Sequence, residues 1–332
     1  MTSSVSDPGV DSAIPWHFGD PLREQRQLVQ AAGVVDRSNR DVIAVSGEER
    51  LSWLHTICSQ HLTDLTDGDA TEALVLSPHG HVEQHWQLVE LGGVVWIDTE
   101  PGAAPLVLDY LQKMRFLKRV EPVDVSADWA VLSLVGPQMA SVLTAAGLSL
   151  PAQRRAEALA DGGFVRRMAW PTTDAADLVV PRAQADAMLD RLHAAGAVPA
   201  GSWAFEALRV EARRPRVGFE TDHRTIPHEI GFIGEAVHLN KGCYRGQETV
   251  ARVHNLGKPP RQLVLLHLSG ESDELPEPGT PVELDGRAVG FLGTAVQHYE
   301  LGPVALAVIK RTLAGSPGLA ALTVAGAPVS ID

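Results

Sequence analysis

Apolar residues form short unbroken runs and helically spaced stretches, and the same arrangement occurs twice along the chain. The run 42–45 ends at Gly47, after which apolar side chains recur at helical spacing. These side chains are Leu51, Leu54, Cys58 and Leu62. The run 131–135 likewise ends at Gly136, and a helical pattern follows as far as Gly147. Each pattern predicts a strand, a tight turn and a helix, so we expect two related halves.

Each of these units is followed by β-like segments and a second helix. The expected strands are 71–77, 81–91, 94–98, 164–169 and 178–180, and the expected second helices are 104–116 and 182–195. Helices that alternate with strands in this way predict an α+β fold, here a duplicated ferredoxin-like large domain. We place this domain at 16–255, with halves at about 33–125 and 126–255.

The pattern changes after a breaker-rich linker at 255–260. Short β-branched segments then alternate with turns rich in glycine and proline. They lie at 263–268, 281–284, 288–292, 303–309 and 322–324. Regular short strands without helical periodicity predict a small antiparallel β-barrel at 261–332.

Composition narrows the class of protein. The 332 residues carry a net charge of −13, which argues against nucleic acid or an anionic membrane surface as the main partner. The two cysteines, Cys58 and Cys243, imply no disulfide framework and fit a reducing cytoplasm. Cys58 lies on an apolar helical stripe and is expected in the core. Residues 1–15 are polar and acidic, lack the order of a signal peptide, and predict a disordered tail.

The segment 241–248, Lys-Gly-Cys-Tyr-Arg-Gly-Gln-Glu, concentrates reactive chemistry. Lys241 and Arg245 flank Cys243, and nearby cations favour a thiolate, so the thiol is a candidate reactive group with Lys241 beside it. Gly242 and Gly246 allow positive φ angles or close backbone approach. The alternative is an ordinary turn in which Cys243 is a small packing residue.

This segment resembles the K-G-C-[aromatic]-x-G-Q-E signature of the YgfZ-like folate-binding proteins, relatives of the glycine-cleavage T-protein, an aminomethyltransferase. The stretch 74–80 and the stretch 226–229 also resemble segments of that family. The resemblance implies a T-protein fold with a central folate channel and tetrahydrofolate, or a derivative, as cofactor. It also implies a role in assembly or repair of iron–sulfur clusters in client enzymes, including one that modifies tRNA.

The resemblance carries several residues into the predicted site. Glu211 matches the glutamate that meets the pterin, and a carboxylate suits that edge because it accepts two hydrogen bonds. Alone, Glu211 would read as a solvent-facing helix residue. Four arginines lie at or just beyond the end of a helix expected at 203–213, namely Arg209, Arg213, Arg214 and Arg216. They are candidates for binding the anionic folate tail, Arg209 and Arg213 above all, or else they simply complement the helix dipole. The remaining predicted contacts are Glu229, Tyr244, Arg245, Gln247 and Glu248.

One departure concerns catalysis. Where the aminomethyltransferase carries paired aspartates, this chain has Gln84 and His85. A one-carbon transferase needs a base or charged group near the reacting amine. We therefore favour a folate-binding accessory protein over an enzyme, with a tetrahydrofolate-dependent aminomethyltransferase as the alternative.

A histidine-rich stretch precedes and includes this departure. His79, His81, Glu83 and His85 alternate, so on a regular strand all would point to one face. That face is a metal site, part of the folate channel, or a plain exposed surface. We expect no metal there.

Overall fold

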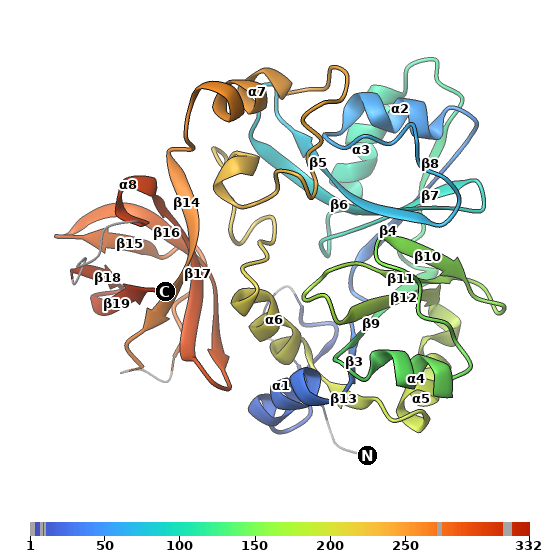
Figure 1. Ribbon diagram of the computed structural model, residues 1–332, viewed down its shortest axis with the longest axis horizontal. Coiled ribbons are helices and arrows are strands. Elements are labelled where there is room, and N and C mark those ends of the chain that lie inside the picture. The colour runs from blue at the N-terminus through green and yellow to red at the C-terminus, as the bar shows by residue number, and fades with distance from the viewer. Residues whose placement is uncertain (1–3, 7–8, 10, 271–273, 315–320) are drawn as a thin grey trace.

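A computed structural model of the chain describes residues 4–6, 9, 11–270, 274–314 and 321–332 (Figure 1). The predicted fold class is confirmed: a large α+β domain is followed by a small closed antiparallel barrel. No helix in this part of the chain is long and apolar enough to cross a membrane.

The first half of the large domain is a five-stranded arrangement with two helices. Its elements are β4 (Asp41–Ser46), α2 (Arg50–Ile57), β5 (Asp69–Leu76), β6 (Val82–Leu91), β7 (Val94–Thr99), α3 (Ala104–Arg115) and β8 (Glu121–Asp124). The strands lie in the order β5-β6-β7-β4-β8. Helices α2 and α3 bury Leu54 and Val107 against the sheet, and Cys58 is 1% exposed in the same cluster, as predicted.

The second half repeats that order with one addition. Its elements are β9 (Trp129–Val135), α4 (Met139–Ala145), β10 (Arg155–Ala158), β11 (Phe164–Arg167), β12 (Ala175–Pro181), the 3₁₀ turn η1 (Arg182–Gln184), α5 (Ala185–Ala194) and β13 (Val198–Ala200). The order is β10-β11-β12-β9-β3-β13, where β3 (Gly33–Asp36) precedes β4 in the chain. Strand β10 pairs with β5 through Arg155 and Asp69, so both halves form one eleven-stranded sheet.

Matching glycines explain why each half turns sharply after its first strand. Gly47 and Gly136 have φ angles of 111° and 127°, which favour glycine. A Cβ at Gly47 would lie 2.2 Å from the carbonyl oxygen of Arg119, and one at Gly136 would lie 2.4 Å from that of Ala31. The two positions are therefore equivalent in backbone conformation as well as in sequence.

The barrel closes in the order β14-β17-β16-β15-β18-β19. Its elements are β14 (Arg261–Leu268), β15 (Pro281–Leu284), β16 (Arg287–His298), β17 (Gly302–Lys310), α8 (Arg311–Ala314), β18 (Leu322–Val324) and β19 (Ala327–Ile331). Strand β19, which the sequence pattern did not predict, joins β18 to β14 and closes the barrel.

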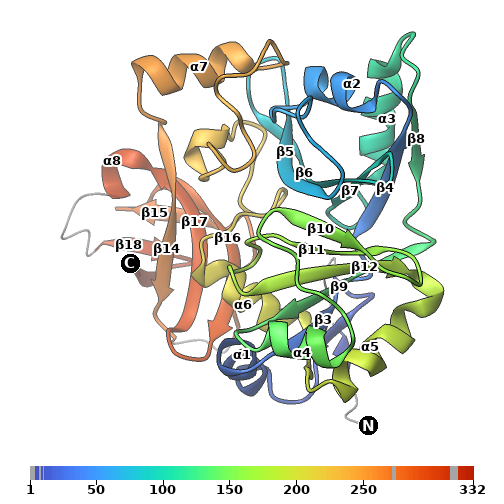
Figure 2. The same ribbon diagram turned by 45° about the vertical axis from the view of Figure 1, so that its right-hand side comes forward.

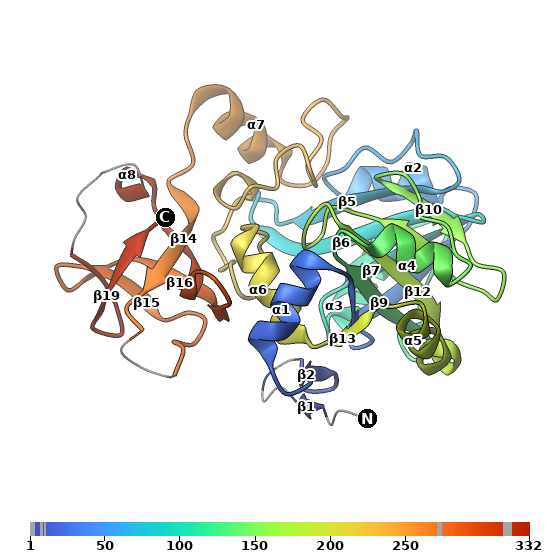
Figure 3. The same cartoon turned by 60° about the horizontal axis from the view of Figure 1, so that its bottom comes forward.

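Helix α6 (Ser202–Glu211) lies between the large domain and the barrel (Figures 1 and 3). Its Phe205 and Leu208 pack into the core of the large domain, whereas Ala207 and Val210 pack against barrel strands. Helix α1 (Pro21–Gln30) lies beside it, and the turn η2 (Pro227–Glu229) and helix α7 (Gln247–Leu256) lead over to the barrel (Figure 2).

Two described residues of segment 1–15 are buried. Ile14 is 4% exposed, and Asp11 is 8% exposed and forms an ion pair with Arg216 at 2.9 Å. Strands β1 (Val5–Ser6) and β2 (Pro15–His17) pair with each other, whereas Val5, Ser12 and Ala13 are exposed. Residues 1–3, 7, 8 and 10 of the predicted tail lie outside the described residues.

Candidate functional site

Two neighbouring cavities lie where α6, the N-terminal segment and the barrel meet. The larger, about 500 Å³, is lined by Trp16, Trp203, Phe219 and Val296, among others. The smaller, about 20 Å³, lies toward the large domain. Both are lined by Asp11, Ser202, Glu206 and Arg216.

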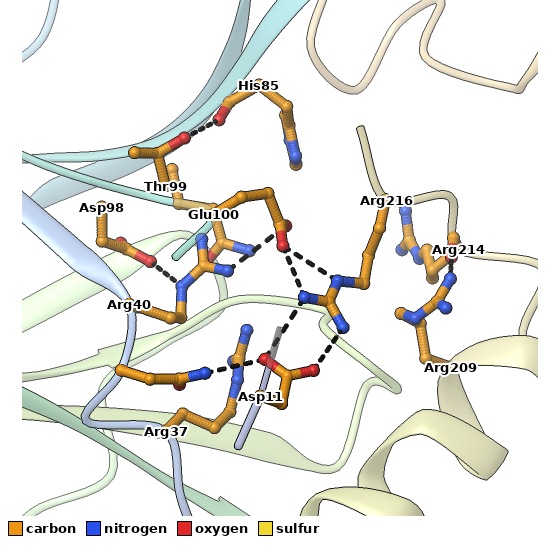
Figure 4. A network of polar contacts seen from close by, with 12 residues as sticks. Asp11, Arg37, Arg40, His85, Asp98, Thr99, Glu100, Arg209, Arg214 and Arg216 are labelled. Carbon is orange, nitrogen blue, oxygen red and sulfur yellow. Dashed lines mark hydrogen bonds and ion pairs between the residues drawn. The ribbon is translucent and has the colours of Figure 1, made fainter. Parts of the chain in front are cut away.

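A chain of ion pairs runs through this region (Figure 4). Arg216 contacts Asp11 at 2.9 Å, Glu100 at 2.8 Å and Glu206 at 3.3 Å. Glu100 in turn contacts Arg40 at 3.4 Å. Burial raises the pKa of Glu100, but the charges of Arg216 and Arg40 outweigh it and lower that pKa to about 2. The carboxylate is therefore ionised at neutral pH and holds both guanidinium groups in place.

Arg37 is the cation of this network with the weakest compensation. Its Nη1 donates to Ser133 Oγ at 3.1 Å, and its ion pair with Asp177 spans 3.8 Å. Burial and the nearby charge of Arg40 lower the pKa of Arg37 to about 10. Because Arg37 lines the small cavity, it favours an anionic group there.

The large cavity presents an aromatic wall. The rings of Trp16 and Trp203 stack with centroids 4.6 Å apart and planes 22° apart. Ser202 Oγ and Trp203 Nε1, from residues beside this wall, are buried and have no hydrogen-bond partner among the described residues. Buried polar atoms are rarely left unpaired in a folded protein.

The place of the transferase aspartates contains side chains that are already engaged. Gln84 Oε1 accepts a hydrogen bond from Trp86 Nε1 at 2.9 Å. His85 is buried, lies 2.8 Å from a carboxylate oxygen of Glu72, and packs beside Phe232 with ring centroids 4.7 Å apart. Neither side chain is a carboxylate, and both already have hydrogen-bonding partners.

Lys241 is a structural residue of the 241–248 segment. It is 6% exposed, and its ammonium donates to the carbonyl oxygens of His55, Cys58 (2.7 Å) and Gln60 (2.9 Å), at and beyond the end of α2. Its charge acts on the buried Cys58 thiol, whose pKa burial nevertheless raises. The predicted pairing of Lys241 with the Cys243 thiol thus gives way to a helix-end contact, since Lys241 points inward and Cys243 is exposed.

The rest of the segment builds the connection into α7. Tyr244 is buried, with Lys241 Nζ 4.9 Å from its ring centroid, and Gln247 donates to the carbonyl oxygen of Lys241 at 3.2 Å. Gly246 has a φ of 81°, and a Cβ there would lie 2.6 Å from Ser77 O. The segment 241–248 therefore packs closely on the turn at 77–80, which belongs to the stretch 74–80.

The charged residues of the segment have partners on the surface. Arg245 contacts Glu83 at 3.2 Å, and Glu248 contacts Arg252 at 2.9 Å one turn along α7. Such exposed pairs contribute little to stability. Cys243 is exposed, and Gly242 beside it has open space around it.

The other predicted folate contacts lie away from the cavities or are fully paired. Glu211 is half-exposed and lies 3.4 Å from His298 Nε2, and it lines neither cavity. Arg209 is fully buried and donates to Glu206, Glu220 and Thr294. Arg213 is exposed and contacts Asp332.

Glu229, also predicted to contact folate, is buried against the barrel, where it accepts hydrogen bonds from Arg261 at 2.8 and 2.9 Å. Glu206 and Arg216 do line the cavities on this side. Arg216 belongs to the arginine cluster that the sequence marked as a candidate anion site, whereas Glu206 was not selected. The available signal was that Glu206 lies within a helix between apolar residues that are buried, such as Phe205 and Ala207.

The histidine-rich stretch does not present one face. His79 and His81 lie in the turn before β6. Within β6, His85 is buried and Glu83 is exposed. A β-bulge pairs Leu76 with Val82 and Val75 with Gln84, which breaks the alternation. Within the described residues, no group of three or more metal-binding side chains is suited to a metal ion.

The fold and the family match together place the protein in the T-protein class. The chain belongs to the GCVT N-terminal domain family, which it matches over residues 12–241. The predicted relation to the glycine-cleavage T-protein is therefore confirmed.

Known relatives fit this class. The chain is 27% identical over 266 residues to the protein of Arabidopsis thaliana named "Putative transferase At1g60990, chloroplastic", an alignment that covers 78% of this chain but only 60% of that protein. It is also 27% identical over 314 residues to the aminomethyltransferase of Synechococcus elongatus, covering 91% and 83%. The glycine cleavage system aminomethyltransferase T of Bartonella henselae shares the fold, with a TM-score of 0.86, 19% identity and coverage of 99% and 93%.

Proposed function

We propose that this protein is a folate-binding accessory protein of the YgfZ-like branch, which supports assembly or repair of iron–sulfur clusters in client enzymes. A tRNA-modifying enzyme is one such client by the family resemblance. The observation that carries the proposal is Cys243: its thiol is exposed, whereas Lys241, Tyr244 and Gln247 of the same segment have structural contacts. An exposed free thiol is accessible to a reaction partner.

Tetrahydrofolate, or a derivative, fits the large cavity. The stacked indoles of Trp16 and Trp203 offer a flat apolar wall, and Glu206 offers a carboxylate that can accept from an aminopyrimidine edge. Arg216, which also lines this cavity, supplies a guanidinium group for an anionic part of the ligand. We place the protein in the cytoplasm, with folate and iron–sulfur client proteins as its partners and no nucleic acid bound directly.

The alternative is a folate-dependent aminomethyltransferase, which the names of several relatives favour. The engaged Gln84 and His85 argue against it, because neither supplies a carboxylate for the reacting amine. With the lipoyl carrier protein and tetrahydrofolate, we expect no turnover above background. A robust rate would establish the transferase instead.

Two measurements test the main proposal. Titration with tetrahydrofolate species should quench tryptophan fluorescence, because Trp16 and Trp203 line the cavity. In cells that lack their own such protein, the wild type should restore the activity of iron–sulfur enzymes and Cys243→Ala should not. The matched control is Cys58→Ala, which removes the buried thiol and keeps Cys243. Full complementation by Cys243→Ala would remove the thiol from the function.

A further inference from the structure

Asp11 lies inside the candidate site although it belongs to the N-terminal segment. Its Oδ2 lies 2.9 Å from Arg216 Nη1, and its Oδ1 accepts from Asn39 Nδ2 at 2.7 Å. Figure 4 shows the Asp11 carboxylate joined to Arg216, and Arg37 lines the same small cavity. A side-chain carboxylate thus fills a position with a guanidinium and an amide as donors, which is the environment that a ligand carboxylate requires.

Asp11 also lies on the boundary between the two cavities. Its side chain lines both of them, as does Arg216. Arg37, the weakly compensated cation, lines only the small cavity. Asp11 is therefore one of four described residues, with Ser202, Glu206 and Arg216, that border both the large cavity and the small cavity lined by Arg37.

The charges of the network do not require Asp11. Each arginine pairs with carboxylates of the folded domains: Arg37 with Asp177, Arg40 with Asp98 and Glu100, Arg166 with Asp98 and Asp177, Arg209 with Glu206 and Glu220, and Arg216 with Glu100 and Glu206. These arginines and carboxylates are equal in number, so Asp11 is an additional negative charge. Its departure leaves no buried cation without a carboxylate partner, which keeps the cost of displacement low.

The segment is anchored just beyond Asp11. Ile14 is buried, Trp16 stacks on Trp203, and a Cβ at Gly201 would lie 2.1 Å from Trp16 O. Between these anchors and Asp11, Ser12 and Ala13 are exposed. Asp11 can therefore leave its position through a change in a few exposed residues while the wall of the large cavity stays in place.

From these contacts we infer that Asp11 occupies a carboxylate subsite of the protein's own ligand, and that a ligand carboxylate displaces it to reach Arg216 and Arg37. This inference rests on the proposed folate function, because the glutamate tail of folate supplies such a carboxylate. Asp11 thereby lowers the affinity for any ligand that needs the subsite and leaves ligands without a carboxylate unaffected.

The test compares Asp11→Asn with Asp20→Asn in the full chain. Asp20→Asn also removes one negative charge from the N-terminal region. Asp20 caps the N-terminus of α1 by accepting a hydrogen bond from Arg23 N, and asparagine can keep that hydrogen bond. The probes are 5-formyltetrahydrofolate, which carries the glutamate tail, and 6-methyltetrahydropterin, which lacks it. Asp11→Asn should bind the folate roughly tenfold more tightly, the scale of one charged hydrogen bond, and the pterin as the wild type does. Asp20→Asn should match the wild type for both.

Unchanged or weaker folate binding by Asp11→Asn, or equal tightening for both probes, overturns the inference while leaving folate binding intact. Failure of every variant to bind either probe refutes the folate proposal. In that case, hydrogen exchange without ligand still tests the contact between Asp11 and Arg216. The Ile14 amide, which donates to Asp11 O at 3.1 Å, should exchange faster in Asp11→Asn than in the wild type. Unchanged exchange there shows that the carboxylate does not hold the segment.

Discussion

Replacing Lys241 with methionine tests whether this residue holds the fold or activates Cys243. The ammonium donates to the carbonyl oxygens of His55, Cys58 and Gln60, and its residue is 6% exposed. Methionine keeps the apolar length of the side chain and removes only the donors. The carbonyl groups of Cys58 and Gln60 then lose a buried partner that water does not readily replace.

The expected loss of stability follows from these contacts. A hydrogen bond to a charged group contributes about 1.5–3 kcal/mol, but bonds that share one donor group do not add in full. We therefore expect Lys241→Met to lower the free energy of unfolding by about 2–4 kcal/mol. Lys258→Met, the same exchange at an exposed position, should stay within about 0.5 kcal/mol.

Native-state hydrogen exchange of the α2 amides measures the loss where it arises, without assuming that all domains unfold together. In parallel, the rate of Cys243 alkylation at fixed pH is measured in each variant. Lys241 is buried and points away from the exposed thiol, so Lys241→Met should leave that rate unchanged. A stability change below about 1 kcal/mol together with clearly slower alkylation of Cys243 would refute the structural role.

Three further predictions concern the thiols, the cavity and pH. Cys243 should be alkylated at least about a thousandfold faster than Cys58, because the 1% exposed Cys58 reacts only after opening that costs roughly 5 kcal/mol; peptide mass spectrometry measures both, and similar rates contradict the burial of Cys58. Glu206→Gln should weaken folate binding by about 1.5–3 kcal/mol, whereas Glu211→Gln should weaken it by less than about 0.5 kcal/mol. Melting temperatures of both variants serve as the control, and the reverse ranking would return the pterin contact to Glu211. Since the pKa of Glu100 is about 2 in the folded protein and about 4.3 when unfolded, its contribution is present above about pH 4.3 and lost as pH falls toward 2. Acid titration of stability should therefore be flatter in Glu100→Gln, by up to about 3 kcal/mol, and an identical curve would exclude this carboxylate as a source of acid sensitivity.

Local patterns were sufficient to predict most of the fold. Glycine at positions 47 and 136 follows an apolar run and precedes a helical stripe, and these signals depend only on neighbouring residues. Strand β3 was not predicted, although it lies between β9 and β13 in the sheet. Pairing between residues so distant in sequence leaves no periodic signal in a short segment.

The site was less predictable because proximity in sequence does not determine where a side chain points. Lys241 and Cys243 are two residues apart, yet one is buried under α2 and the other is exposed. Arg209 and Arg216 belong to one basic stretch, but Arg209 is fully paired and only Arg216 lines the cavities. Asp11 was assigned to a tail because its partner, Arg216, lies far along the chain.

The position of β3 has a consequence for how the chain assembles. Residues 33–36 are synthesised before strands β4 to β8, but their partners β9 and β13 end only at Val135 and Ala200. A fragment cut between the halves, at 125–128, would leave one piece with an unpaired strand and the other with a gap in its sheet. The halves are thus repeats in topology but not independent units, and such fragments should become fully ordered only by reassociating, as in strand complementation.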